Sequence, residues 1–186
     1  MSSSFVYHPH VHQSDGTVIT PDIAIDRVYA SDADGLIARP VSRLTSAATI
    51  QQPADAPIGT PAVVLLAASY GMLIAPVVIL EDALALGRAV WRLDDIRDGY
   101  GDVMLRSWTV AAGKKTAFQA ETLGGLMSPA DAMGALGNAS GLKPGTAVFI
   151  GHPAPLGESL LVDRFEVALE FGDRSLGYGI EIEPLG

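Results

Sequence analysis

The side chains in this sequence with the clearest chemical potential are isolated histidines, arginines and carboxylates. His152 lies in a Pro/Gly-rich loop, Gly151 to Gly157, directly after an apolar segment. Such a histidine could act as a general base or an oxyanion partner near neutral pH, or it could simply bond to a backbone carbonyl. Arg106 could hold a carboxylate through two parallel hydrogen bonds, or pair with Asp102 or Asp94 at the surface.

Further residues are candidates to line the same cavity. Glu121 joins His152 and Arg106 in the candidate catalytic set, and the candidate substrate contacts are Gln119, Tyr178 and Trp108. We find no Ser-His-Asp pattern. Gly124-Gly125 lacks the Lys-Ser/Thr pair that a phosphate-binding loop requires. The sequence therefore predicts no cofactor.

His8, His10 and His12 occupy every second position near the start of the chain. On an extended strand they would share one face, an arrangement that could suit a metal ion. No carboxylate accompanies them at a known spacing, and Pro9 limits strand pairing. We favour a solvated, flexible chain end over residues 1–15 and predict no metal site there.

Bulk properties restrict the possible classes of protein. A chain of 186 residues with 48% hydrophobic residues fits a single domain, residues 1–186, with a substantial core. A net charge of −9 argues against a nucleic-acid partner, because phosphate-binding surfaces need clustered Lys and Arg. The absence of cysteine excludes disulfides and thiolate chemistry. Cytoplasm is the default location.

The longest apolar stretch, Pro61 to Leu80, is the segment to test for a membrane span. Ser69, Tyr70, Gly71 and Pro76 interrupt it. We interpret it as two strands joined by a turn at Tyr70-Gly71, and we expect no membrane partner.

Strand signals dominate the rest of the chain. Lys143-Pro144-Gly145 is a turn, and the β-branched and aromatic segment Thr146 to Ile150 follows it as a strand. Apolar residues alternate with Glu166, Ala168 and Glu170 between residues 165 and 171, which indicates a strand with one buried face. A second hairpin is predicted from residues 102–112 and 116–121.

Two helices are expected. Glu81 to Val90 is rich in Ala and Leu and carries acidic residues in its first turn. Pro129 to Leu136 follows Ser128 as the N-cap and precedes Gly137 as a stop signal. The Pro-rich loop Gln51 to Gly59 is the best internal boundary, but it does not separate domains.

The order of strands and loops from Gly141 to the C-terminus resembles the C-terminal end of the fumarylacetoacetate hydrolase (FAH) superfamily, and most closely its DUF2848 branch. Three blocks extend the similarity: Ala89 to Ile96, Met104 to Trp108, and Phe118-Gln119 with Leu126 to Ala130. The resemblance covers roughly residues 88–186. It implies a single α+β, mainly β domain, a mixed β-sandwich roll or distorted barrel with few helices.

The resemblance also implies a metal site whose ligands this chain lacks. FAH-like proteins hold Mg²⁺ with a Glu-x-Glu pair and a later Asp. The corresponding segments here, Ile58 to Leu66 and Ala75 to Asp82, offer only Glu81 and Asp82. Adjacent strand residues point to opposite faces, so these two cannot reproduce the site. The remaining Glu-x-Glu, Glu181 to Glu183, is expected to face solvent.

Two functions follow as hypotheses. The first is a metal-independent FAH-like enzyme that performs acid/base chemistry on a small carbonyl or polyketide-like substrate, by isomerisation, dehydration, cyclisation or decarboxylation. The second is a non-catalytic structural or regulatory subunit paired with a metal-bearing homologue. In either case we expect dimerisation, as a homodimer or a heterodimer with a homologue.

Overall fold

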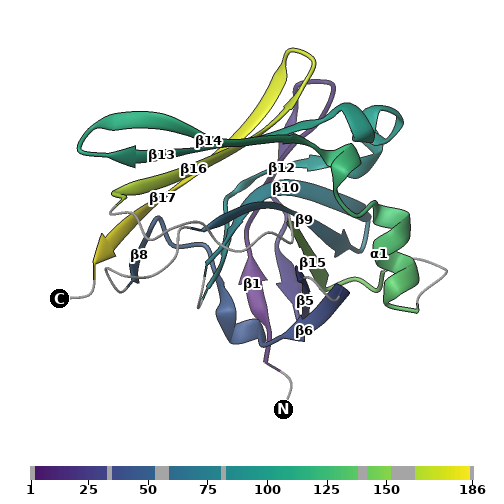
Figure 1. The fold of residues 1–186 in the computed structure, drawn as a ribbon. Coiled ribbons are helices and arrows are strands. Elements are labelled where there is room, and N and C mark those ends of the chain that lie inside the picture. Colours follow the sequence, from purple (N-terminus) through teal and green to yellow (C-terminus); the bar gives the residue numbers. More distant parts are fainter. Residues whose placement is uncertain are drawn as a thin grey trace.

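The computed structural model describes residues 3–32, 35–52, 59–80, 83–137, 142–151 and 162–184. Within these ranges the chain forms two large mixed sheets and one small one, so the expected mainly β architecture with few helices is confirmed. Figure 1 shows the five-stranded sheet lying across the larger sheet, with the single α-helix at one end.

The larger sheet has ten strands, with β9 and β10 at its centre. Its main path runs, in spatial order, through β3 (Val18–Ile19), β2 (His10–His12), β12 (Ala89–Arg92), β10 (Gly71–Ile79), β9 (Thr60–Ala68), β15 (Thr146–Gly151), β5 (Arg27–Asp32) and β6 (Gly35–Arg39). Off this path, β11 (Leu84–Leu86) pairs with β10, and β7 (Leu44–Thr45) pairs with β11.

The second sheet has five strands. They are, in spatial order, β14 (Lys114–Thr122), β13 (Met104–Ala111), β16 (Arg164–Phe171), β17 (Arg174–Pro184) and β8 (Thr49–Gln52). A separate pair joins β1 (Phe5–Tyr7) to β4 (Ile23–Ile25). The helical elements are η1 (Val41–Arg43), η2 (Leu93–Asp95), η3 (Arg97–Asp102), η4 (Leu123–Gly125) and α1 (Pro129–Ala135).

Apolar side chains from both faces of β9 and β10 form the core. One face contributes Val64, Leu66 and neighbours to a cluster beneath the large sheet. The other face contributes Val63, Leu65 and Ile74 to the layer that packs against the five-stranded sheet. Because β9 and β10 are covered on both faces, they read in the sequence as continuous apolar runs rather than alternating ones.

Most of the sequence-based element predictions are confirmed. The strands at 146–150, 165–171, 102–112 and 116–121 correspond to β15, β16, β13 and β14. The apolar stretch Pro61 to Leu80 forms the hairpin β9–β10, as predicted, and Gly71 has a positive φ of 138° at its turn. Ser128 caps α1, because its Oγ accepts a hydrogen bond from the Asp131 backbone N–H at 3.1 Å.

The helix predicted over Glu81 to Val90 is wrong in the described part of that segment. Residues 84–86 form β11, which pairs with β10, and β12 begins at Ala89. All three β11 side chains are buried, and Gly87 packs directly against the Tyr178 ring. Ala and Leu favour burial as well as helix, and pairing with β10 outweighed the helix propensity.

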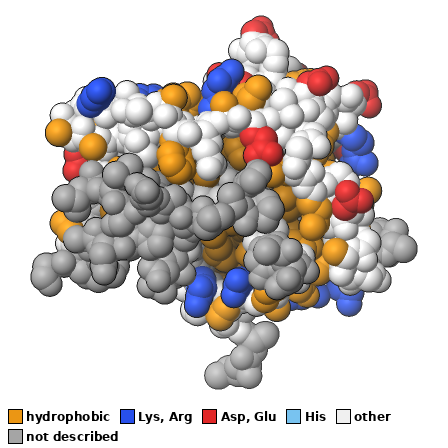
Figure 2. All heavy atoms as spheres, in the orientation of Figure 1, with side chains coloured by type: hydrophobic (Ala, Val, Ile, Leu, Met, Phe, Trp, Pro, Cys, Tyr) orange, Lys and Arg blue, Asp and Glu red, His pale blue; other side chains and the backbone are white. Residues whose placement is uncertain are grey.

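Part of the N-terminal segment that we expected to be flexible belongs to the fold. β1 and β2 lie within residues 5–12, and Tyr7 and Val11 are almost fully buried. None of the helices in the described part of the chain is long and apolar enough to cross a membrane. Figure 2 shows Lys and Arg side chains spread singly or in pairs over the face drawn, with no continuous basic patch.

Candidate functional site

The five-stranded sheet separates two of the residues that we grouped as catalytic. Arg106 lies opposite Ala168 and carries an exposed side chain that forms an ion pair with Glu170. Glu121 lies opposite Leu105, whose side chain is buried on the other face of β13. Neighbouring positions along a strand point to opposite faces, so Arg106 and Glu121 face opposite sides of the sheet. His152 lies outside the described residues.

The three candidate substrate contacts also divide between the two faces. Gln119 lies opposite buried Ser107, on the inner face. The backbone N–H of Gln119 donates a hydrogen bond to Ser107 Oγ at 3.1 Å. Trp108 is on the outer face, with the Lys115 ammonium 4.6 Å from the centre of its indole ring. Tyr178 lies opposite Val167 and packs against Gly87. Of the predicted set, Trp108 presents its side chain to a hollow on the outer face, whereas Tyr178 lies on the inner face with Val167.

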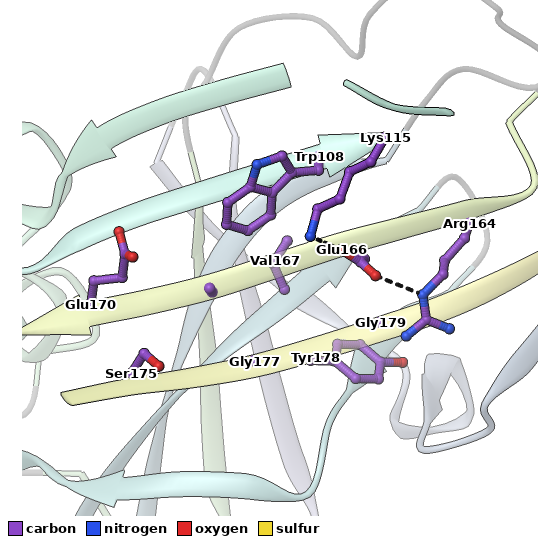
Figure 3. A pocket seen from close by; sticks show the side chains of 11 residues that line it. Trp108, Lys115, Arg164, Glu166, Val167, Glu170, Ser175, Gly177, Tyr178 and Gly179 are labelled. Carbon is purple, nitrogen blue, oxygen red and sulfur yellow. Dashed lines mark hydrogen bonds and ion pairs between the residues drawn. The ribbon is translucent and has the colours of Figure 1, made fainter. Parts of the chain in front are cut away.

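This outer hollow, with a volume of about 430 Å³, lies over β13, β16 and β17. Glu166 stands at its centre, 2.7 Å from Lys115 Nζ and 3.0 Å from Arg164 Nε (Figure 3). Hydrogen bonds first from Lys115 and then from Arg164 hold the pKa of Glu166 below its usual value. The carboxylate is therefore ionised at neutral pH and is a weak base.

A second hollow, the edge hollow, has a volume of about 280 Å³ and lies where β2 and β12 meet β17. His12, Gln13, Trp91 and Arg174 line it. The Arg174 guanidinium lies 5.0 Å from the centre of the Trp91 ring, and this stacking fixes its position. No carboxylate lines this hollow among the described residues, and none of them forms an ion pair with Arg174.

The hairpin that follows β2 fixes the place of His12. The backbone N–H of Gln13 donates to Thr17 O at 2.9 Å, and its side chain donates to Thr17 Oγ1 at 2.8 Å. Arg92 donates to the Gln13 side-chain oxygen at 3.2 Å, which ties the hairpin to β12. Gly16 supplies the positive φ of the turn, 87°.

One edge of β17 is open beside this hollow. β8 pairs only with Glu181 to Pro184, so residues 174–179 of β17 have β16 as their one strand partner in the described chain. Alternate backbone N–H and C=O groups of that stretch therefore lack a strand partner on the side away from β16. They add hydrogen-bonding groups to the edge hollow next to Arg174.

The three N-terminal histidines have different surroundings. His10 and His12 are exposed and flank buried Val11 in the sequence, as alternation along a strand requires. His8 Nδ1 instead pairs with Asp22 at 2.6 Å. No group of three or more His, Cys, Asp or Glu side chains able to hold a metal occurs within the described residues.

The residues of β9 and β10 do not fit the metal that FAH-like proteins carry. Both strands consist of apolar residues, Thr60 apart, in a region where the resemblance implies carboxylate ligands. Glu81, Asp82 and His152 lie outside the described residues. The expected solvent-facing Glu-x-Glu is confirmed, because Glu181 and Glu183 are exposed, and Glu181 pairs with Arg164.

Sequence reasoning missed Lys115, Arg164 and Arg174 as site residues. Alternation along residues 164–170 would have placed Arg164 on the same face as Glu166. His12 and Arg174 line the same hollow although they are 162 residues apart in the sequence, and no local sequence pattern indicates that they lie close together.

Comparisons with known structures identify the fold. A candidate fumarylacetoacetate isomerase/hydrolase of Oleispira antarctica is similar to this chain with a TM-score of 0.60 and 12% identity, over 93% of this chain and 99% of its own. A 2-keto-3-deoxyarabinonate dehydratase matches with a TM-score of 0.61 and 11% identity, over 87% of this chain and 75% of its own. A candidate isomerase of Escherichia coli matches with a TM-score of 0.57 and 14% identity, over 94% of this chain and 99% of its own. The fold is that of the FAH superfamily.

The family follows from the sequence. The pattern of the family described as "Protein of unknown function (DUF2848)" matches residues 81–182, more than half of the chain. The chain belongs to the DUF2848 family, as its sequence motifs indicated. No curated protein matches it.

Proposed function

We propose that this chain is a metal-independent enzyme that performs acid/base chemistry on a small carbonyl compound bearing a carboxylate, in the edge hollow. The observation that carries the proposal is that His12 lines the same hollow as Arg174, a stacked guanidinium without a carboxylate partner among the described residues. The net charge of the protein is −9, so a locally cationic hollow stands out as an anion-binding site.

Each group has a distinct part in this chemistry. Arg174 binds the substrate carboxylate, and its fixed position over Trp91 reduces the ordering that binding requires. The His12 imidazole removes a proton from the carbon next to the carbonyl, and the electron pair moves to the carbonyl oxygen to form an enolate. Return of that proton from His12 to the oxygen gives the enol tautomer, and when a C=C bond is conjugated with the enolate, its return to the far carbon of that bond shifts the double bond.

The walls of the edge hollow suggest the type of substrate. Trp91, Leu176 and Ala89 supply an apolar lining, and the volume of about 280 Å³ is at the lower end for ligand pockets. A small acid with an apolar tail fits this lining better than a short, fully polar oxo acid.

Proton exchange tests the proposal without knowledge of the natural substrate. Wild-type protein in D₂O should exchange the α-protons of 2-oxo-4-phenylbutanoate faster than those of 2-oxobutanoate, as followed by ¹H NMR. His12→Gln should lower the exchange rate by at least about 100-fold, the usual contribution of a general base. Arg174→Gln should mainly raise the substrate concentration needed for half-maximal exchange.

His10→Gln is the matched control, because His10 lies on the same strand and is exposed but does not line the hollow. It should exchange at the wild-type rate. Exchange by wild type no faster than by buffer would contradict the proposal and favour the non-catalytic subunit. Equal loss in His10→Gln and His12→Gln would also contradict it.

A further inference from the structure

The outer hollow is a separate feature that the proposed reaction does not use. It shares only Ser175 and Gly177 with the edge hollow, and no charged side chain lines both. Ala168, Gly177 and Gly179 form its floor with small side chains or none, and Figure 3 shows Gly177 and Gly179 on β17 between larger side chains. Such a floor of small residues on a sheet suits a planar molecule.

Two cations at one end of this floor keep unused donors. Lys115 has three N–H donors and directs one at Glu166. Arg164 uses Nε on Glu166 and Nη1 on Glu181. Its Nη2 lies over Gly179, where even a methyl group would overlap it, and makes no hydrogen bond to any described residue. Donors therefore remain for an incoming anion.

The carboxylates of the hollow, by contrast, are already engaged. Glu166 accepts from both Lys115 and Arg164, and Glu170 pairs with Arg106. A cationic ligand would have to displace these partners, whereas an anionic ligand can use the free donors. The balance of donors and acceptors favours a negatively charged ligand.

One aromatic side chain borders the hollow on this face. Trp108 rises beside the floor and presents its indole next to Lys115. A flat ring on the floor can therefore contact the indole while its acidic group reaches the two cations.

From these features we infer that the outer hollow binds a planar aromatic acid. The ring lies on Ala168 and Gly177 beside Trp108, and the carboxylate accepts hydrogen bonds from Arg164 and Lys115. This site is distinct from the reaction centre and is suited to hold an effector or a product that carries an aryl carboxylate.

Calorimetric titration with 2-naphthoate tests the inference, with 2-naphthalenemethanol as the uncharged probe of equal size. Wild type should bind the acid and not measurably bind the alcohol. Arg164→Gln should weaken binding by at least about tenfold, the value of a lost charge-assisted hydrogen bond. Ala168→Leu should also abolish binding, because it fills the floor and leaves every charge in place.

Arg97→Gln is the matched control, since it removes an exposed guanidinium that pairs with Asp94 and lines neither hollow, and it should bind 2-naphthoate as wild type does. Circular dichroism confirms that each variant is folded. Equal affinity for the acid and the alcohol, no binding of the acid by wild type, or unchanged binding in folded Ala168→Leu would each overturn the inference. Loss of proton exchange in His12→Gln with binding intact would separate this site from the proposed reaction centre.

Discussion

Glu166 connects three strands through charge. It lies on β16, bonds to Lys115 on β14 and to Arg164 on its own strand, and Arg164 in turn pairs with Glu181 on β17. The Glu166 side chain is only 24% exposed, so solvent screens these pairs less than it would at a fully exposed site. The network should therefore stabilise the outer face of the sheet in a pH-dependent way.

We predict that this stabilisation disappears in acid. Lys115 and Arg164 lower the pKa of Glu166 from its ordinary value of 4.5 in the folded state, and the unfolded chain regains that value. The contribution is complete above about pH 4.5 and is lost as the pH falls through the folded-state pKa. The difference in Tm between wild type and Glu166→Gln should be constant from about pH 5 to 7 and shrink below pH 4.5. A difference that grows in acid would contradict this account.

The candidate residues show what side-chain type can and cannot predict. Trp108 and Tyr178 are predicted from their chemistry as substrate contacts; Trp108 faces the outer hollow, whereas Tyr178 packs on the inner face with Val167, and the role of both stays a prediction. Arg106 and Glu121 were chosen in the same way, yet the register between β13 and β14 places them on opposite faces. The register shifts at Ser107/Trp108, and a bulge of this kind has no reliable signal in one sequence.

At the scale of elements, hydrophobic alternation and turn residues predicted most strands and turns correctly. Phe165, Val167 and Leu169 are buried on β16 as the period of two requires, and Gly145 takes the positive φ expected at its turn, 94°. The segment containing β11 misled because its Ala and Leu residues fit a helix and a doubly covered strand equally well. Only its partner β10, supplied by the tertiary fold, decides between them.

The turn between β13 and β14 offers an element-scale prediction. Ala112 and Gly113 have positive φ values of 51° and 77°, which define a two-residue turn that normally carries Asn-Gly. Alanine is strained in this conformation, so Ala112→Asn should raise the free energy of unfolding by about 1 kcal/mol. Urea denaturation followed by circular dichroism measures the change.

Thr116→Asn is the control for that change, since it places the same residue on the exposed part of β14 outside the turn. It should leave stability unchanged or lower it slightly, because Asn is a poor strand former. Both variants keep the backbone N–H at position 112 that donates to Asp163 at 2.8 Å, so destabilisation by Ala112→Asn would contradict the strain account.

At the scale of the whole molecule, the chain keeps the FAH fold while its central strands carry hydrophobic side chains. β9 and β10 are nearly fully buried and contribute to the apolar layers on both faces of the sheet. A carboxylate placed there without a cation would be strongly unfavourable, which accounts for the apolar composition of these two strands. The expected dimer stays a prediction, for which sedimentation velocity is the measurement.

The metal dependence of α-proton exchange tests the central claim most directly. Protein treated with a chelator and then dialysed should exchange 2-oxo-4-phenylbutanoate at the rate of untreated protein, and added Mg²⁺ or Mn²⁺ should not change that rate. His12→Gln should remain inactive with or without the ions. Exchange that vanishes on chelation and returns with Mg²⁺ would contradict the account, because it would show that carboxylates elsewhere in the chain hold a working metal ion.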